Sequence, residues 1–67
     1  MNEFETKVLE VAARVTGPED LAEWVEGTLF VECSNETASL LESEFEVAFR
    51  CRIIRSKAGG EHAFDFA

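Results

Sequence analysis

Three side chains of this sequence could act as a nucleophile, a base or a metal ligand: the thiols of Cys33 and Cys51 and the imidazole of His62. The reference pKa of histidine lies near neutrality, so His62 could take a proton from a cysteine or bind a metal ion. The sequence has neither an HxxxH nor a CxxC spacing, and Glu61 beside the histidine is ordinary for a turn. These observations favour a structural or solvent-exposed histidine and predict no catalytic residue, no metal and no cofactor.

The two cysteines are expected to remain free thiols. A helix over residues 35–49 would separate them by about 22 Å, from roughly 15 residues at 1.5 Å each, whereas a disulfide needs Cα atoms within about 7 Å. Alternation along strands places both cysteines on apolar sides, where a free cysteine behaves as a small hydrophobe. Reduced thiols are typical of a cytoplasmic protein.

Charge is divided unevenly along the chain. Fourteen acidic and six basic residues give a net charge of −8. Residues 1–49 hold twelve acids and two bases, a net of −10, and residues 50–67 hold two acids and four bases, a net of +2. An acidic body repels phosphate backbones and attracts basic protein surfaces. We therefore expect a protein partner and no direct contact with nucleic acid.

Length and composition predict one folded domain over residues 1–67. The chain is 46% apolar and contains six Phe and one Trp, which is too rich for a disordered segment. No window approaches the roughly 20 apolar residues of a membrane span, and the start Met-Asn-Glu-Phe-Glu lacks the pattern of a signal peptide. We expect a cytoplasmic location and no membrane contact.

The N-terminal part, residues 1–27, is predicted to form a helical hairpin. Phe4, Val8, Val11, Ala12 and Val15 follow the spacing of one helix face, which predicts a helix over 3–16. Gly17-Pro18 would end this helix and begin a second one, over 18–26, because proline fits the first turn of a helix. The apolar stripe of that second helix would be Leu21, Trp24 and Val25, with Gly27 closing it.

The remainder, residues 28–66, is predicted to form a strand, a helix and two further strands. Residues 28–33 contain β-branched and aromatic residues, with Leu29, Val31 and Cys33 on one face, as in a strand. Residues 44–53 alternate as a strand would, but Ala38, Leu41, Phe45 and Ala48 repeat as on a helix, with Ser34 or Asn35 as its cap. Strong helix formers favour a helix over 35–49. Residues 50–56 and 62–66 then form strands joined by a turn at 58–60.

These elements predict an α+β fold with two N-terminal helices followed by a βαββ unit. A right-handed crossover would make the first two strands parallel, and the third would pair antiparallel with one of them, in order 1-3-2. Such a three-stranded mixed sheet, with helices on one face, resembles half of a ferredoxin-like fold. The resemblance concerns element order over residues 28–66 only, and it implies no activity because that fold hosts many functions.

One face of the sheet is expected to close the core and the other to remain open. The core face would carry Leu29, Val31, Ile53, Phe64 and Phe66. The uncovered face mixes apolar and charged groups, which is typical of a contact surface. Its predicted partner-binding residues are Phe30, Glu32, Arg50, Arg52, Ile54 and Asp65. The alternative is a solvated face on which Arg52 pairs with Glu32 or Asp65.

The expected second helix offers another candidate surface. Its predicted partner-binding residues are Glu19, Asp20 and Glu23, which share the side opposite Trp24. We expect Trp24 to belong to the core, the alternative being a docking stripe with Leu21 and Val25. Acidic runs of this kind are usually only solvated. Together with further glutamates they could instead imitate a phosphate backbone; these are Glu3, Glu5, Glu10, Glu26, Glu42, Glu44 and Glu46.

Three hypotheses of function follow. The first is a non-enzymatic protein-binding module that regulates or inhibits a larger protein; in size, acidity and lack of motif it resembles small host-directed proteins encoded by phages. The second is a DNA mimic that blocks a nucleic-acid-binding protein. The third is a small enzyme without a recognisable motif. We also expect a two-fold homodimer through the open face, with Phe30 and Ile54 covered and Arg52 facing Glu32 or Asp65 of the second copy.

Overall fold

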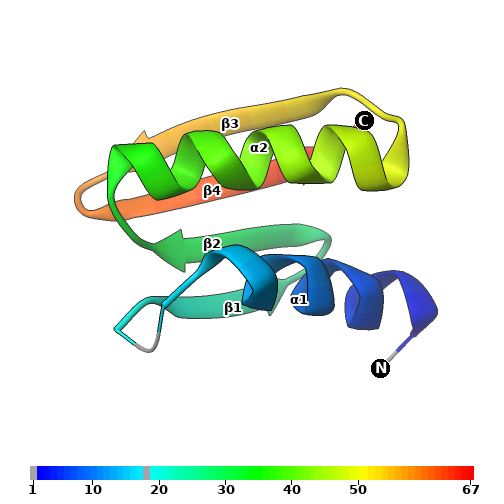
Figure 1. The fold of residues 1–67 in the computed structure, drawn as a ribbon, viewed down its shortest axis with the longest axis horizontal. Helices are drawn as coiled ribbons and strands as arrows, with labels where there is room; N and C mark the ends of the chain where they lie inside the picture. The colour runs from blue at the N-terminus through cyan, green and yellow to red at the C-terminus, as the bar shows by residue number, and fades with distance from the viewer. Residues whose placement is uncertain (1, 18) are drawn as a thin grey trace.

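Two helices lie on one face of a four-stranded antiparallel sheet (Figure 1). The computed structural model describes residues 2–17 and 19–67. Its elements, in chain order, are α1 (Glu3–Val15), β1 (Leu21–Val25), β2 (Thr28–Glu32), α2 (Asn35–Phe49), β3 (Ile53–Ala58) and β4 (Glu61–Phe66). Neither helix is long and apolar enough to span a membrane, within those described residues.

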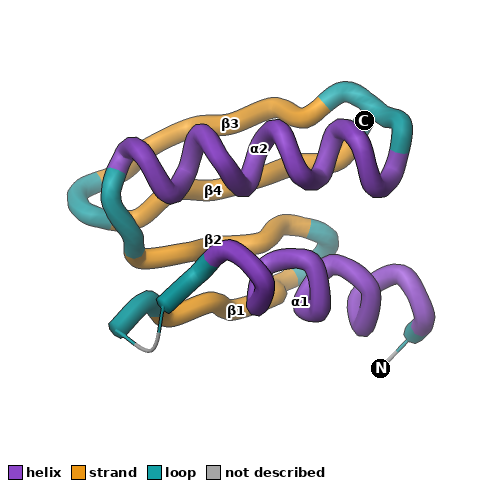
Figure 2. Tube along the Cα trace, viewed as in Figure 1, coloured by secondary structure: helices purple, strands orange, loops and turns teal. Residues whose placement is uncertain are grey.

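The strand order is β1-β2-β4-β3, and every neighbouring pair is antiparallel. The prediction of two N-terminal helices followed by a three-stranded mixed sheet is therefore wrong, and so is the half-ferredoxin-like resemblance. The expected central place of the last strand does occur, because β4 lies between β2 and β3. Two αββ units in succession build the whole chain, and the opposite, helix-free face of the sheet remains uncovered (Figure 2).

The predicted helix over residues 18–26 is wrong because its described part contains a strand. Residues 21–25 form β1, and Pro18 lies outside the described residues. Glu26 and Gly27, with φ of 47° and 86°, form a two-residue turn that pairs Val25 with Thr28. Two residues with positive φ match the right-handed twist of a hairpin. The apolar residues of 21–25 are also spaced as on one face of a helix, but this segment forms a strand because it pairs with β2.

Both predicted long helices are confirmed. In α1 the buried residues are Val8, Val11 and Ala12, and the Asn2 side chain accepts the Glu5 N–H at 2.8 Å as an N-cap. In α2 the expected cap at Ser34 accepts the Thr37 N–H at 3.2 Å. The alternation over residues 44–49 thus belongs to a helix, since a helix buries Phe45 fully while leaving Val47 exposed.

The strand predicted over residues 50–56 begins later, at Ile53, and extends to Ala58. Arg50 instead terminates α2 in the left-handed conformation, with φ 50°, and its N–H bonds to the Glu46 carbonyl. Arg52 lies between the two elements, and its carbonyl accepts the Ala67 N–H at 3.0 Å. Because α2 extends to Phe49, residues 50–52 form the connection in which the chain reverses direction before β3 begins.

The core lies between the helices and the inner face of the sheet. Its buried side chains include Leu29, Val31, Ile53 and Phe64, as expected, and Phe66 packs against them half-buried. An aromatic cluster extends this core at the end of the sheet where α2 finishes, and its members are Phe4, Trp24, Phe45, Phe49, Phe64 and Phe66. Trp24 therefore belongs to the core layer and not to a docking stripe.

Candidate functional site

The candidate site is the open sheet face, which we define by the strand residues that point away from the helices. Antiparallel partners share a face, so the register sorts these residues into three rows across β1, β2, β4 and β3. The first row is Val25, Thr28, Asp65 and Ile54; the second is Glu23, Phe30, Ala63 and Ser56; the third is Leu21, Glu32, Glu61 and Ala58.

Large apolar side chains on this face are exposed to solvent. Leu21 is 65% exposed, Ile54 51% and Val25 40%, while Phe30 is half-buried at the middle of the sheet. Single exposed apolar residues are ordinary on protein surfaces. Here several share one helix-free face, and this arrangement is characteristic of contact surfaces.

The charged side chains of the open sheet face are all acidic. Glu23, Glu32, Glu61 and Asp65 supply four carboxylates, and the twelve strand positions of the face include no basic residue. Glu32 and Glu61 stand directly opposite each other on neighbouring strands, an arrangement that destabilises a sheet. The Asp65 carboxylate accepts a hydrogen bond from the Thr28 hydroxyl, so this acid is oriented by its neighbour.

A depression of about 320 Å³ lies on this face where β1, β2 and β4 are side by side. Its lining is part apolar and part acidic, and consists of Leu21, Ala22, Glu23, Phe30, Glu32 and Glu61. Three glutamates and one phenylalanine therefore line the same depression. Such a lining suits a group that is cationic and has an apolar or planar body.

The structure separates the predicted partner-binding residues into three places. The open sheet face carries Phe30, Glu32, Ile54, Asp65 and Glu23. Arg50 and Arg52 lie outside the strands, in the connection between α2 and β3. Glu19 and Asp20 precede β1, and the Asp20 carboxylate accepts the Gly17 N–H at 2.9 Å.

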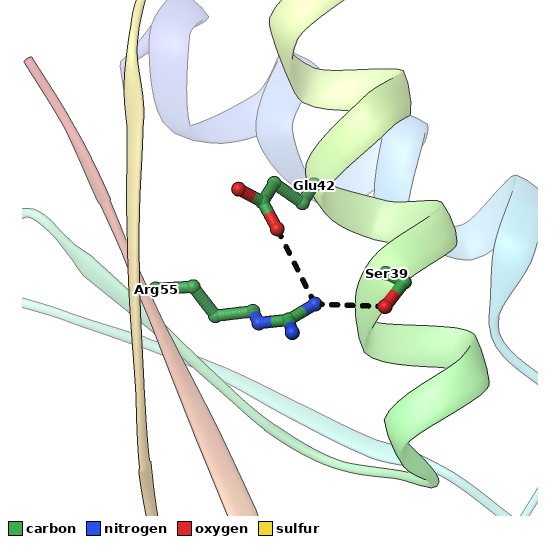
Figure 3. Close-up of polar contacts among 3 residues, drawn as sticks. All are labelled: Ser39, Glu42 and Arg55. Carbon is green, nitrogen blue, oxygen red and sulfur yellow. Dashed lines mark hydrogen bonds and ion pairs between the residues drawn. The ribbon is translucent and has the colours of Figure 1, made fainter.

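Two other basic residues point to the helix side of the sheet. Arg55 donates to the Ser39 hydroxyl at 3.1 Å and forms an ion pair of 3.3 Å with Glu42 (Figure 3). Lys57 donates to the Asn35 side-chain oxygen at 3.1 Å. Both contacts tie β3 to α2. Strand β3 therefore contributes no basic residue to the open sheet face. Arg55 and Lys57 lie one and three residues after Ile54, so alternation along a strand could have predicted that they point to the other face.

The acids proposed to imitate a phosphate backbone are divided between opposite faces. Glu23 lies on the open sheet face, whereas Glu42 lies on α2 and pairs with Arg55. A helix over residues 18–26 would have placed Glu19, Asp20 and Glu23 on one side. In the structure Glu23 belongs to β1, whereas Glu19 and Asp20 precede that strand. Strand β1 thus replaces the acidic helix expected over residues 18–26, which supplied part of the acidic surface in the DNA-mimic hypothesis.

The three residues with reactive side chains are His62, Cys33 and Cys51. His62 is 2% exposed on the helix side of the sheet, and neither of its ring nitrogens has a hydrogen-bond partner. Burial lowers the pKa of His62, and the charges of Lys57 and Arg55 lower it further. The nearby Cys33 backbone raises this pKa, although it is not placed to form a hydrogen bond with either ring nitrogen. Burial also raises the pKa of the Cys33 thiol, as does Asp20.

Within residues 2–17 and 19–67, no three His, Cys, Asp or Glu side chains are grouped to hold a metal ion. The cysteines are free and half-buried, Cys33 just after β2 and Cys51 just after α2. Helix α2 runs between them, so they sit at its opposite ends. The histidine is buried in the layer between the sheet and the helices.

Sequence reasoning missed Leu21, Val25 and Glu61 as members of the open sheet face. The first two were assigned to a helix, and Glu61 was assigned to a turn. The available hairpin signal was the Glu26-Gly27 pair, which has aromatic and β-branched residues on both sides, at 24–25 and at 28–31. Comparisons with protein-family models, with curated proteins and with solved structures found no significant match to this chain.

Proposed function

We propose that this chain is a protein-binding module whose open sheet face covers a basic and partly apolar surface of a larger protein. The observation that carries the proposal is the composition of that face: exposed apolar side chains beside four carboxylates, without a basic residue in its three rows. A chain that covers a partner's surface can occlude it, so the role we assign is that of a non-enzymatic regulator or inhibitor.

Both halves of the composition support a partner of this chemistry. Docking would remove Leu21, Val25 and Ile54 from water, and burial of apolar surface contributes about 25 cal/mol per Å² before association costs. Basic groups on the partner would neutralise Glu32 and Glu61, whose mutual repulsion the free protein retains. Complementary charge also accelerates encounter, which suits an inhibitor.

One property of the chain bears on its place of action and another on its partner. Cys33 and Cys51 are free thiols, which persist in a reducing compartment. The net charge of −8 keeps the body of the protein away from phosphate-rich surfaces such as nucleic acids. We therefore include a cytoplasmic location in the proposal, with a protein as the partner.

The test compares two lysine substitutions at exposed aliphatic residues on opposite layers. Ile54 is 51% exposed on the open sheet face, and Leu40 is 58% exposed on α2. Ile54→Lys removes an apolar contact and repels a basic partner, while Asp65 opposite it accommodates the new charge in the free protein. Leu40→Lys makes the same chemical change away from the face. Circular dichroism must first show that both variants are folded.

Immobilised wild-type protein and both variants are then incubated with a lysate of the source cells, and retained proteins are identified by mass spectrometry. We expect a stoichiometric partner that wild type and Leu40→Lys retain and Ile54→Lys loses. Equal retention by all three baits would refute the open sheet face as the docking surface. Displacement of the partner by excess duplex DNA would favour the DNA-mimic alternative instead.

A further inference from the structure

We propose that the depression on the open sheet face is a pocket for one arginine side chain that the partner protein inserts. This inference rests on the proposed function and specifies the group that would anchor the partner. Phe30 supplies an aromatic ring, and Glu23, Glu32 and Glu61 supply carboxylates around it. A volume of about 320 Å³ lies at the low end of ligand pockets, about 300–1,000 Å³, and accommodates a side chain.

The strand register explains why these side chains converge. Glu23 stands opposite Phe30 across the β1–β2 ladder, and Glu32 stands opposite Glu61 across the β2–β4 ladder. On one face of a strand, Phe30 and Glu32 are neighbours two residues apart. Phe30 is therefore bordered by acids from β1, β2 and β4, three adjacent strands of the sheet. All of these positions belong to regular strands, which hold the pocket in place before any ligand arrives.

Three glutamates line the pocket, two of them directly opposite each other on neighbouring strands, and no basic residue lines it. The one ion pair in the described part of the chain joins Arg55 and Glu42 on the helix side. Lys57 is likewise bound to Asn35 on that side. A second depression, along α1, already includes Lys7 among its lining residues, so its acids have a basic neighbour. Of these two depressions, the one on the open sheet face has acidic lining residues and no basic one, and an external cation would neutralise them.

Arginine fits this lining better than lysine does. A guanidinium is planar, stacks on aromatic rings and donates two parallel hydrogen bonds to a carboxylate. It is also more weakly hydrated than an ammonium group, so its transfer to a half-apolar pocket costs less. Leu21 and Phe30 provide apolar surface for the methylene stem, and Glu32, between Leu21 and Glu61 in its row, is the central acceptor.

The probe for this pocket is N-acetyl-arginine methylamide, a blocked arginine that carries no carboxylate. It is titrated into the ¹⁵N-labelled full chain, and backbone amide shifts are followed by NMR. N-acetyl-citrulline methylamide is the matched neutral probe, because it has the same shape without the charge. We expect saturable shifts centred on Glu23, Phe30, Glu32 and Glu61 with the arginine probe, and at least tenfold weaker binding of citrulline.

Two charge-matched variants complete the test. Glu32→Gln removes the central acceptor, and Glu44→Gln removes an exposed carboxylate from α2. We expect about tenfold weaker arginine binding for the first and no change for the second. Equal effects of both variants, shifts spread over the helices, or equal binding of citrulline would overturn the pocket.

This result is separable from the fate of the proposed function. If Ile54→Lys abolishes capture of the partner but the arginine probe leaves the pocket residues unshifted, the docking face stands and the arginine pocket is wrong. If the arginine probe binds in the pocket but Ile54→Lys retains the partner, the pocket is supported and the wider docking face is wrong.

Discussion

His62 is a buried imidazole in a core that is otherwise apolar, and its ring nitrogens have no hydrogen-bond partner. A buried polar group without a partner costs stability, and charging it costs more. Lys57 and Arg55 on β3 add to this cost, since both lower the pKa of His62 after burial has done so. The Cys33 backbone is the one opposing influence.

We predict that the free energy of unfolding falls as the pH is lowered below about 6.5. The unfolded chain binds a proton at His62 with a pKa of 6.5, whereas the folded pKa is lower. Stability is therefore complete above 6.5 and is lost as the pH falls toward and through the folded pKa, with a slope of at most about 1.4 kcal/mol per pH unit. Urea unfolding between pH 7.5 and about pH 5, followed by Trp24 fluorescence, measures it.

The matched variant for this prediction is His62→Leu, which keeps an apolar side chain in the core without a titrating group. It should be at least as stable as the wild type at pH 7, and its free energy of unfolding should change much less than that of the wild type between pH 7.5 and about pH 5, because it has no imidazole to protonate. Parallel pH profiles of wild type and variant would show that another group causes the loss.

At the element scale, the β1–β2 hairpin is the part of the fold on which the open sheet face depends. β1 supplies Leu21, Glu23 and Val25 to that face and turns Ala22 and Trp24 toward the helices. As an edge strand it has one paired side only. Its backbone is held by the ladder to β2, and Trp24 anchors it through ring contacts with Phe4 and Phe66.

We predict that Ala22→Val stabilises the protein by about 0.5 kcal/mol, because a β-branched residue favours a strand and would pack beside Val31 across the ladder. The control is Ala13→Val on α1. Both alanines are exposed, and in a helix the same change costs about 0.5 kcal/mol. Chemical denaturation of the two variants should therefore give shifts of opposite sign. A loss of stability in the Ala22→Val variant would contradict this prediction.

At the scale of the whole molecule, the charge of the open sheet face constrains how two copies could meet. A face-to-face dimer would bring together four carboxylates from each copy. The expected pairing of Arg52 with Glu32 or Asp65 of a second copy stays a prediction, and Arg52 lies outside the strands that form the face. Burial of the exposed apolar residues would then favour such a dimer, and repulsion between the carboxylates of the two copies would disfavour it.

We predict that self-association through this face is weak at low ionic strength and strengthens with added sodium chloride. The screening length shortens from about 30 Å at 0.01 M to about 3 Å at 1 M, which weakens repulsion between carboxylates and leaves the apolar contact unscreened. Light scattering should give the monomer mass of 7.5 kDa at low salt. The variant Ile54→Ser should stay monomeric throughout. A dimer that dissociates when salt is added would instead indicate pairing through Arg52.

The sequence alone determined the two helices and most of the core. Each helix is long enough for its apolar spacing to recur over three or four turns, and a local cap such as Ser34 marks the start. Leu29, Val31, Ile53 and Phe64 could be assigned to the core because alternation along one strand depends only on neighbouring residues. These signals are contained in short stretches of chain.

Only the tertiary structure decided the nature of residues 21–25, the sheet order and the charge of the open sheet face. Five residues fit a helical stripe as well as a strand, so pairing with β2 had to decide between them. The pocket joins Leu21, Glu32 and Glu61 in one row, and these residues are far apart in sequence. Cross-strand register depends on how distant segments pack together, and the spacing of residues along the chain does not encode it locally.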